Sequence, residues 1–218
     1  GLGMLEKIID EAQGNVPASL VIKNIAVFNL ITGETVRGDI AVCDDRIVGV
    51  GETYDGEREI DGSGLTAVPG FIDAHVHVES SMITPFEFER CVLPRGVTTA
   101  VCDPHELSNV AGTKAIDFFL ESARRMCMDL RVEVSSCVPS TPLETAGAAL
   151  SAADVCKYAS EPLSSGLAEL MNVPGVLFKV PEVLEKVEAF HGRIDGHCPM
   201  LTGKALNAYL AAGVRNCH

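Results

Sequence analysis

The stretch Val68-Pro-Gly-Phe-Ile-Asp-Ala-His-Val-His77 decides the fold of this chain. An apolar run ends here on two histidines, His75 and His77, spaced i and i+2. Alternate residues of a β-strand point to the same side, so both imidazoles can converge on one metal ion at the end of the strand. Pro69-Gly70 interrupts regular secondary structure just before the strand, and the acidic Asp73 precedes the histidines on the same face. This context is more specific than a chance His-x-His pair. The stretch therefore predicts a catalytic metal site.

The composition is that of a globular protein with an acidic surface. A formal net charge of −13 and the lack of any Lys/Arg cluster argue against nucleic acid as a partner. No apolar run approaches the roughly 18 residues of a membrane span, and the N-terminus lacks the features of a secretion signal. We therefore expect a cytoplasmic protein with no membrane partner.

The eight cysteines are scattered and include no Cys-x-x-Cys pair. Most have apolar neighbours, where reduced thiols of the core are common, so we expect them to be mainly structural. His77-Val-Glu79 fits the His-x-Glu half of the zinc nucleobase-deaminase signature, but the Pro-Cys-x-x-Cys half is missing. That class of deaminase is therefore excluded.

The pattern of the chain changes at Pro69, which predicts two domains. Residues 1–69 combine an amphipathic helix near 4–13 with short β-rich runs and turn signals, typical of a small β-sandwich-like domain. Residues 70–218 alternate between strands and helices, which favours a parallel α/β sheet and, as first choice, a (β/α)-barrel. The predicted strands lie near 71–76, 97–102, 131–138, 165–170, 193–197 and 213–217, and the clearest helices near 85–93, 109–126, 181–190 and 202–212.

Polar residues follow several of these strands directly. In a barrel the C-terminal ends of all strands face one mouth, where side chains from different strands meet around a substrate. Residues 70–218 are nevertheless fewer than the about 250 of a typical complete barrel, and only six strands are predicted instead of eight. We therefore expect an incomplete TIM barrel that belongs to a longer polypeptide.

The candidate metal ligands fall into three groups at the ends of predicted strands: a pair of histidines, one glutamate and two later histidines. Imidazole nitrogens and carboxylate oxygens suit Mn, Fe or Zn. Glu169 could bridge two ions with its two oxygens, or could pair at the surface instead. His197 could be a simple loop histidine, and His218 is the weakest candidate because a terminal residue is often disordered. The full set is His75, His77, Glu169, His197 and His218.

Two further segments supply candidates of lower rank. His105 and Glu106, in Cys102-Asp-Pro-His-Glu106, could orient a ligand or relay a proton as catalytic residues, or could form a solvated turn. Ser80 and Ser81 could hydrogen-bond the substrate, or could belong to the N-cap region of the helix that begins near Pro85.

Taken together, these segments resemble the amidohydrolase superfamily and, within it, the adenine deaminase family. The resemblance runs over nearly the whole chain, and its Glu-Ser-Ser, Asp-Pro-His-Glu and Gly-His-Cys-Pro motifs are much more specific than His-x-His. The segments that carry it are Pro69-Gly-Phe-Ile-Asp-Ala-His-Val-His-Val-Glu-Ser-Ser81, Gly96-Val-Thr-Thr-Ala-Val-Cys-Asp-Pro-His-Glu106, Ser135-Ser-Cys-Val-Pro139, Gly166-Leu-Ala-Glu-Leu-Met171, Asp195-Gly-His-Cys-Pro199 and Leu206-Asn-Ala-Tyr-Leu-Ala-Ala-Gly213.

The resemblance implies a composite β domain on a (β/α)8 barrel with a binuclear Mn or Fe centre. It also implies conversion of adenine to hypoxanthine and ammonia in purine salvage, and it matches all five candidate ligands to metal-ligand positions. Glu169 becomes one candidate for moving the proton to the leaving ammonia, the family's other being an aspartate after the eighth strand. A homodimer is expected from the family alone. Two alternatives stay open: an amidohydrolase acting on a cyclic amide or another aminopurine, and a non-catalytic truncated metal-binding domain.

Overall fold

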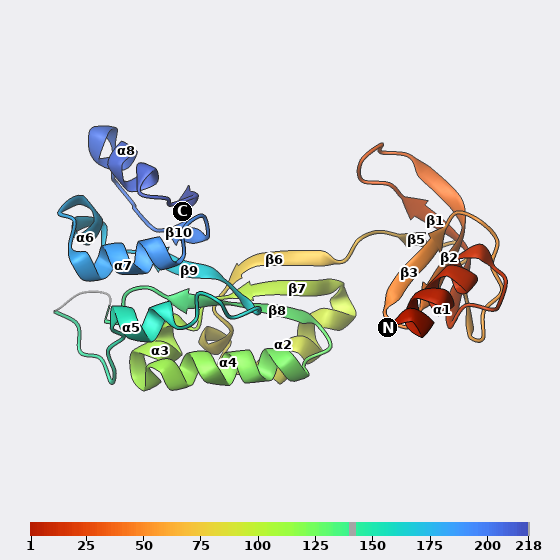
Figure 1. The fold of residues 1–218 in the computed structure, drawn as a ribbon, viewed down its shortest axis with the longest axis horizontal. Coiled ribbons are helices and arrows are strands. Elements are labelled where there is room, and N and C mark those ends of the chain that lie inside the picture. The colour runs from red at the N-terminus through yellow and green to blue at the C-terminus, as the bar shows by residue number, and fades with distance from the viewer. Residues whose placement is uncertain (140–142, 218) are drawn as a thin grey trace. The chain divides into compact units, whose positions relative to one another are not determined.

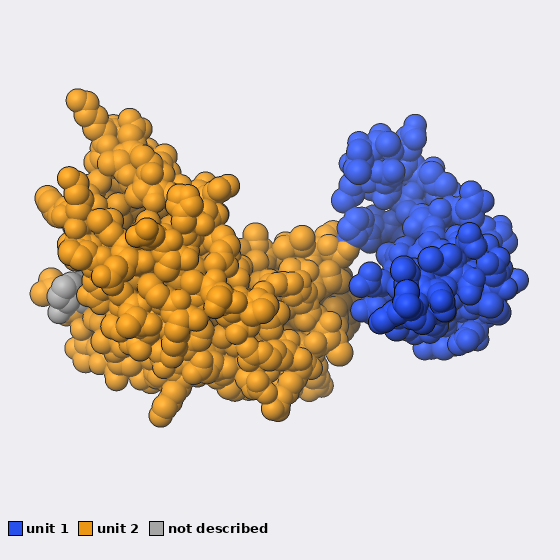
Figure 2. Space-filling view, in the orientation of Figure 1, with its two compact units in different colours: residues 1–69 blue, residues 70–218 orange. Residues whose placement is uncertain are grey.

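A computed structural model describes residues 1–139 and 143–217 of the chain. The chain divides into two compact units, residues 1–69 and residues 70–218, which Figure 2 shows in different colours. The division falls directly after Pro69, where the sequence changes from β-rich runs to alternating strands and helices. None of the helices in the described part of the chain is long and apolar enough to cross a membrane.

The first unit is a five-stranded sheet with one helix. In the sheet, β2 pairs with β1 and β3 in antiparallel fashion, and β4 and β5 run parallel to β1. The helix ends at Gly14, whose φ of 73° is the left-handed conformation that glycine adopts without strain. The elements are α1 (Leu2–Gln13), β1 (Leu20–Phe28), β2 (Thr35–Cys43), β3 (Arg46–Val50), β4 (Glu59–Asp61) and β5 (Thr66–Ala67).

The second unit is a sheet of six parallel strands whose order in the sheet follows their order in the chain. A doubly wound sheet would reverse its strand order part-way, so this order is that of a barrel. The predicted TIM-barrel-like α/β fold is therefore confirmed, with six strands present. Figure 1 shows β6, β7 and β8 of this sheet side by side, with α4 beside β8. The strands are β6 (Phe71–Val76), β7 (Val97–Cys102), β8 (Asp129–Ser135), β9 (Ser164–Leu170), β10 (Ile194–Gly196) and β11 (Asn216–Cys217).

The connecting helices differ from the sequence prediction mainly in their breaks. The helix predicted over 109–126 is two helices, because Gly112 interrupts it with a φ of 62°. The helix near 85 is capped by Thr84, whose hydroxyl accepts from the N–H of Glu87, so Ser80 and Ser81 are not its N-cap. The helices are η1 (Val78–Ser81), α2 (Pro85–Val92), η2 (Leu93–Arg95), α3 (His105–Ala111), α4 (Thr113–Arg125), α5 (Ala152–Cys156), α6 (Val173–Leu177), α7 (Pro181–Ala189) and α8 (Gly203–Ala211).

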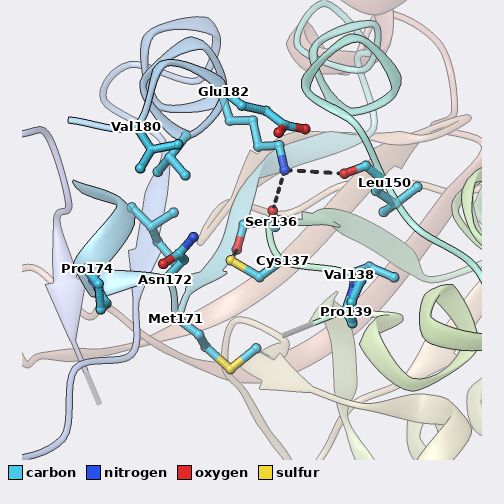
Figure 3. Close-up of a pocket in the computed structure, with 13 residues that line it drawn as sticks. Ser136, Cys137, Val138, Pro139, Leu150, Met171, Asn172, Pro174, Val180 and Glu182 are labelled. Carbon is cyan, nitrogen blue, oxygen red and sulfur yellow. Dashed lines mark hydrogen bonds between the residues drawn. The ribbon is translucent and has the colours of Figure 1, made fainter. Parts of the chain in front are cut away.

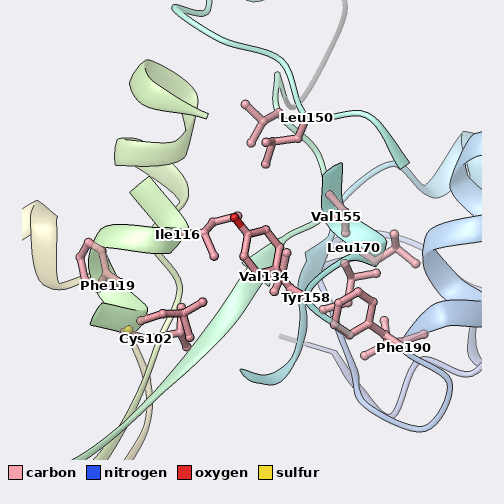
Figure 4. Packing of buried hydrophobic residues seen from close by; sticks show 14 of the residues in the cluster. Cys102, Ile116, Phe119, Val134, Leu150, Val155, Tyr158, Leu170 and Phe190 are labelled. Atoms are coloured by element: carbon pink, nitrogen blue, oxygen red, sulfur yellow. The ribbon is translucent and has the colours of Figure 1, made fainter. Parts of the chain in front are cut away.

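The core of the second unit lies between the sheet and these helices (Figure 4). Helix α4 presents Ile116 and Phe119, spaced as one face of a helix, against the central strands. In β8, residues on both faces are buried, as expected for a parallel strand covered on both sides. Full burial of a side chain such as Phe119 stabilises the fold by about 1.5–3 kcal/mol. This packing fixes the strand ends, which carry the candidate site.

Candidate metal centre

His75 and His77 meet at the C-terminal end of β6. Their Nε2 atoms are 3.2 Å apart, and the two rings lie at 86° to each other. Two nitrogens that bind one tetrahedral ion at the usual metal–nitrogen distance are about 3.3 Å apart. The alternation of the strand thus brings the two rings to the spacing that a shared metal ion requires.

Glu169 completes a group of three ligand atoms. Its Oε1 lies 3.4 Å from Nε2 of His75, and the donor atoms of His75, His77 and Glu169 all lie within 4.8 Å of one another. Glu169 lies next to the end of β9 and has a φ of 21°, a backbone conformation that residues with a Cβ rarely adopt. Such strain is kept where the surrounding structure enforces it, and it often marks a functional residue.

The other ring nitrogen of His77 is fixed by the main chain. Its Nδ1 lies 2.8 Å from the carbonyl oxygen of Asp103. A carbonyl only accepts, so Nδ1 carries the proton and donates it, leaving the lone pair of Nε2 directed at the centre. Burial lowers the pKa of His77, but this hydrogen bond and the neighbouring carboxylates outweigh it and raise the pKa above its usual value.

Three carboxyl groups lie near the two histidines; Asp103 and Glu133 are buried and Glu79 is half-buried. Burial, with added repulsion from neighbouring carboxylates, raises the pKa of Glu79 to about 7, of Asp103 to about 7 and of Glu133 to about 10. Within the described residues, one oxygen of each of these three carboxyl groups is buried without a hydrogen-bond partner. Carboxyl oxygens beside imidazole nitrogens are the ligands that a divalent transition metal accepts, so the residues fit such an ion.

The lower-ranked candidates lie on the rim of this group. The hydroxyl of Ser80 donates to Oε1 of Glu106 at 2.8 Å, and Oε2 of Glu106 is 3.6 Å from Nδ1 of His77. His105 begins α3 beside Glu106 and is half-buried, and burial lowers its pKa. Ser81 is exposed in η1. The structure therefore links Ser80 to Glu106, and through Glu106 to a candidate ligand.

The two later histidines differ in what the structure says of them. His197 follows β10, and its main-chain N–H donates to the hydroxyl of Tyr209. This hydroxyl in turn donates to the carbonyl of Leu170 at 2.6 Å. Tyr209 thus ties the loop of His197 to the end of β9, directly after Glu169. Among the described residues, His197 is not in the close group formed by His75, His77 and Glu169. His218 lies outside the described residues.

Residues 66–218 match the amidohydrolase family. The chain belongs to this family. It is also 59% identical over 215 residues to an adenine deaminase of Cereibacter sphaeroides (strain ATCC 17025 / ATH 2.4.3), covering 98% of this chain and 38% of that relative. An adenine deaminase of Gluconobacter oxydans (strain 621H) is 56% identical over 211 residues, covering 96% of this chain and 37% of the relative. The amidohydrolase chain thus spans less than two fifths of these curated relatives.

Solved structures support the amidohydrolase fold. Atrazine chlorohydrolase TrzN from Arthrobacter aurescens TC1, complexed with zinc, superposes with a TM-score of 0.57 at 15% identity, covering 91% of this chain and 65% of that one. A triazine hydrolase variant gives a TM-score of 0.58 at 16% identity, covering 91% and 64%. At this identity the likeness concerns the fold alone.

The amidohydrolase unit also holds a cavity of about 660 Å³ beside the ends of β8 and β9. Dashed lines in Figure 3 mark two hydrogen bonds in its wall, which Lys186 donates to the carbonyls of Ser136 and Leu150. The hydroxyl of Ser136 donates to the carbonyl of Glu169 at 2.9 Å, which joins this wall to the candidate metal centre. The lining residues are Ser136, Cys137, Val138, Pro139, Leu150, Leu170, Met171, Asn172, Pro174, Val180, Glu182, Val183 and Lys186.

Sequence reasoning missed Glu133 and Asp195, which with His75 form a second close group of possible ligand atoms. The sequence could have indicated Glu133, because it is a single acidic residue between apolar residues of a predicted strand, as Glu169 is. The cysteines also differ from expectation: Cys198 and Cys217 form a disulfide with Cα atoms 6.3 Å apart. Pairing of β10 with β11 brings them together, which the sequence separation conceals.

Proposed function

We propose that the protein to which this chain belongs is an adenine deaminase, which hydrolyses adenine to hypoxanthine and ammonia at a divalent metal centre. The observation that carries the proposal is the convergence of His75, His77 and Glu169 at the barrel mouth of a chain that is 56–59% identical to curated adenine deaminases. Because this chain spans 38% of such a relative, the activity is proposed for the complete polypeptide.

In this proposal His75, His77 and Glu169 hold the metal, with His197 and His218 as ligands of a second ion. A divalent ion held by these residues would supply Lewis acidity, which would lower the pKa of water enough for hydrolysis near neutral pH. Mn is the preferred metal, with Fe or Zn as alternatives, since all three accept imidazole and carboxylate ligands.

The side chains of this chain are proposed to transfer the protons of the reaction. Hydrolysis adds water to C6 of the purine and breaks the bond from C6 to the exocyclic nitrogen. The amino group must gain a proton before this bond breaks, and it then leaves as ammonia. We propose that the carboxylate of Glu169 carries that proton from the attacking water, and its position within the ligand group supports this role. Glu106, hydrogen-bonded to Ser80, would relay protons to the rim together with His105. Ser80 and Ser81 are proposed to hydrogen-bond the purine.

We further infer a cytoplasmic enzyme of purine salvage that acts as a homodimer on a small-molecule substrate. Support for the substrate comes from the curated relatives, which are adenine deaminases. The dimer follows from the family resemblance and is tested by analytical ultracentrifugation. The cytoplasmic location is the expectation drawn from the sequence and is tested by cell fractionation.

The deciding experiment measures ammonia release by the purified full-length protein supplied with Mn²⁺. The substrate panel contains adenine, a second aminopurine such as guanine, and a cyclic amide such as hydantoin. We expect turnover of adenine in clear preference to the others. Folded, metal-loaded protein that leaves adenine intact but opens the cyclic amide would show that the chain serves a different amidohydrolase reaction. Metal binding with no turnover of the panel would favour a non-catalytic domain.

A further inference from the structure

We propose that Glu133 is a positioning residue of the metal centre, which holds the ring of His75 by accepting a hydrogen bond from its Nδ1. The inference deepens the proposed function and rests on the metal centre described there. Glu133 touches neither substrate nor metal in this role. It acts through His75, whose Nε2 faces His77 and Glu169.

The geometry places Glu133 on the far side of His75 from the ligand group. Oε2 of Glu133 lies 3.8 Å from Nδ1 of His75, whereas Oε1 of Glu169 lies 3.4 Å from Nε2 of the same ring. The ring therefore stands between two carboxyl groups, one at each nitrogen. A distance of 3.8 Å is an ion-pair contact, and contacts of this kind commonly shorten to hydrogen bonds when a site is assembled with its ligands.

His77 shows the same arrangement with a different acceptor. Its Nδ1 donates to the carbonyl of Asp103 at 2.8 Å, which leaves Nε2 for the metal. Histidines that bind metals almost always donate their other ring N–H to a carboxylate, a backbone carbonyl or water. With Glu133 as acceptor for His75, both histidines of the His-x-His pair are held in the tautomer that presents Nε2.

The burial of Glu133 supports a specific role. Its side chain is 5% exposed in the middle of β8, and its Oε2 has no hydrogen-bond partner within the described residues. A buried carboxyl oxygen without a hydrogen-bond donor is costly, and Nδ1 of His75 is the ring nitrogen that lies 3.8 Å from this oxygen. Asp195 lies within the same close group and faces the carboxyl of Glu133.

The test compares Mn²⁺ affinity in two variants of the full-length protein, Glu133→Gln and Glu133→Leu. The amide of glutamine can present its oxygen to Nδ1 of His75 and its NH₂ to Asp195, whereas leucine has a similar volume but no acceptor. We expect the dissociation constant of the glutamine variant to stay within about threefold of the parent's. The leucine variant should bind Mn²⁺ about 10–100-fold more weakly, the usual loss when such a supporting partner is removed. Glu11→Leu, which removes a buried carboxylate of the other unit, is the matched control.

Isothermal titration of metal-stripped protein gives the affinities, and circular dichroism checks the fold. The proposal would be overturned if the leucine variant bound Mn²⁺ as tightly as the parent, or if the glutamine variant lost as much Mn²⁺ affinity as the leucine variant. Where the leucine variant does not fold, Glu133→Asp replaces it, since the shorter chain withdraws the oxygen and should weaken binding measurably. A parent that binds Mn²⁺ but does not deaminate adenine would refute the proposed function and leave this inference standing, whereas a parent that binds no Mn²⁺ would overturn both.

Discussion

Replacing Tyr209 by phenylalanine removes one oxygen atom from the interior of the amidohydrolase unit. Tyr209 is fully buried on α8, and its hydroxyl donates to the carbonyl of Leu170 at 2.6 Å and accepts from the N–H of His197 at 3.2 Å. The substitution leaves the ring and its packing in place. The two main-chain groups, one at the end of β9 and one after β10, both lose this partner.

The expected cost follows from these two hydrogen bonds. Each contributes about 0.5–1.5 kcal/mol net, and a buried group that is left without a partner costs about 1–3 kcal/mol. We therefore expect Tyr209→Phe to lower the free energy of unfolding by about 2–4 kcal/mol. Because these groups flank Glu169 and His197, the variant should also bind Mn²⁺ more weakly than the parent.

Urea denaturation of the full-length protein measures the loss of stability. The matched control is Tyr54→Phe, since the hydroxyl of Tyr54 donates a single hydrogen bond, to the carbonyl of Ala12 at 2.8 Å. We expect the control to lose about 0.5–1.5 kcal/mol. A loss for Tyr209→Phe that is no larger than that of the control would refute the argument that its hydroxyl ties the two strand ends together.

Three further predictions concern other parts of the chain. Burial by itself raises the pKa of Asp39, but the Lys23 ammonium and two backbone N–H groups outweigh it and hold the pKa below its usual value. The ionised carboxylate therefore stabilises the fold, and this stability should be lost as the pH falls below about 4. Asp39→Asn should accordingly flatten the pH dependence of the urea midpoint. Lys186→Met should destabilise the fold by about 1–3 kcal/mol in urea, because two main-chain carbonyls lose a charged donor; an unchanged midpoint contradicts this. Glu169→Ala should weaken Mn²⁺ binding at least tenfold in calorimetry, while the exposed Glu87→Ala should leave it unchanged.

Much of the fold was predictable because the parallel strands are short apolar runs separated by helical stretches. His75 and His77 were predictable as a pair because period-two geometry depends only on neighbouring residues. The break at Gly112 was not predictable, because a single glycine within a helical pattern is tolerated in many helices. The backbone of Gly112, with a φ of 62° and a ψ of −136°, separates α3 from α4 in the structure.

The parts of the site that escaped prediction depend on contacts between distant strands. Glu133 reaches His75 across the interior of the sheet, and Tyr209 reaches Leu170 from a helix that packs behind it. Neither contact follows from local periodicity, because each is set by how the sheet curls. Glu169 was predicted because a lone acid at the end of an apolar strand stands out within its own segment.

The most direct test of the metal centre is anomalous diffraction at the manganese edge from crystals of the full-length protein grown with Mn²⁺. We predict a peak about 2.0–2.3 Å from Nε2 of His75, Nε2 of His77 and a carboxylate oxygen of Glu169. Manganese bound elsewhere, with these three side chains making no contact with it, would contradict the account.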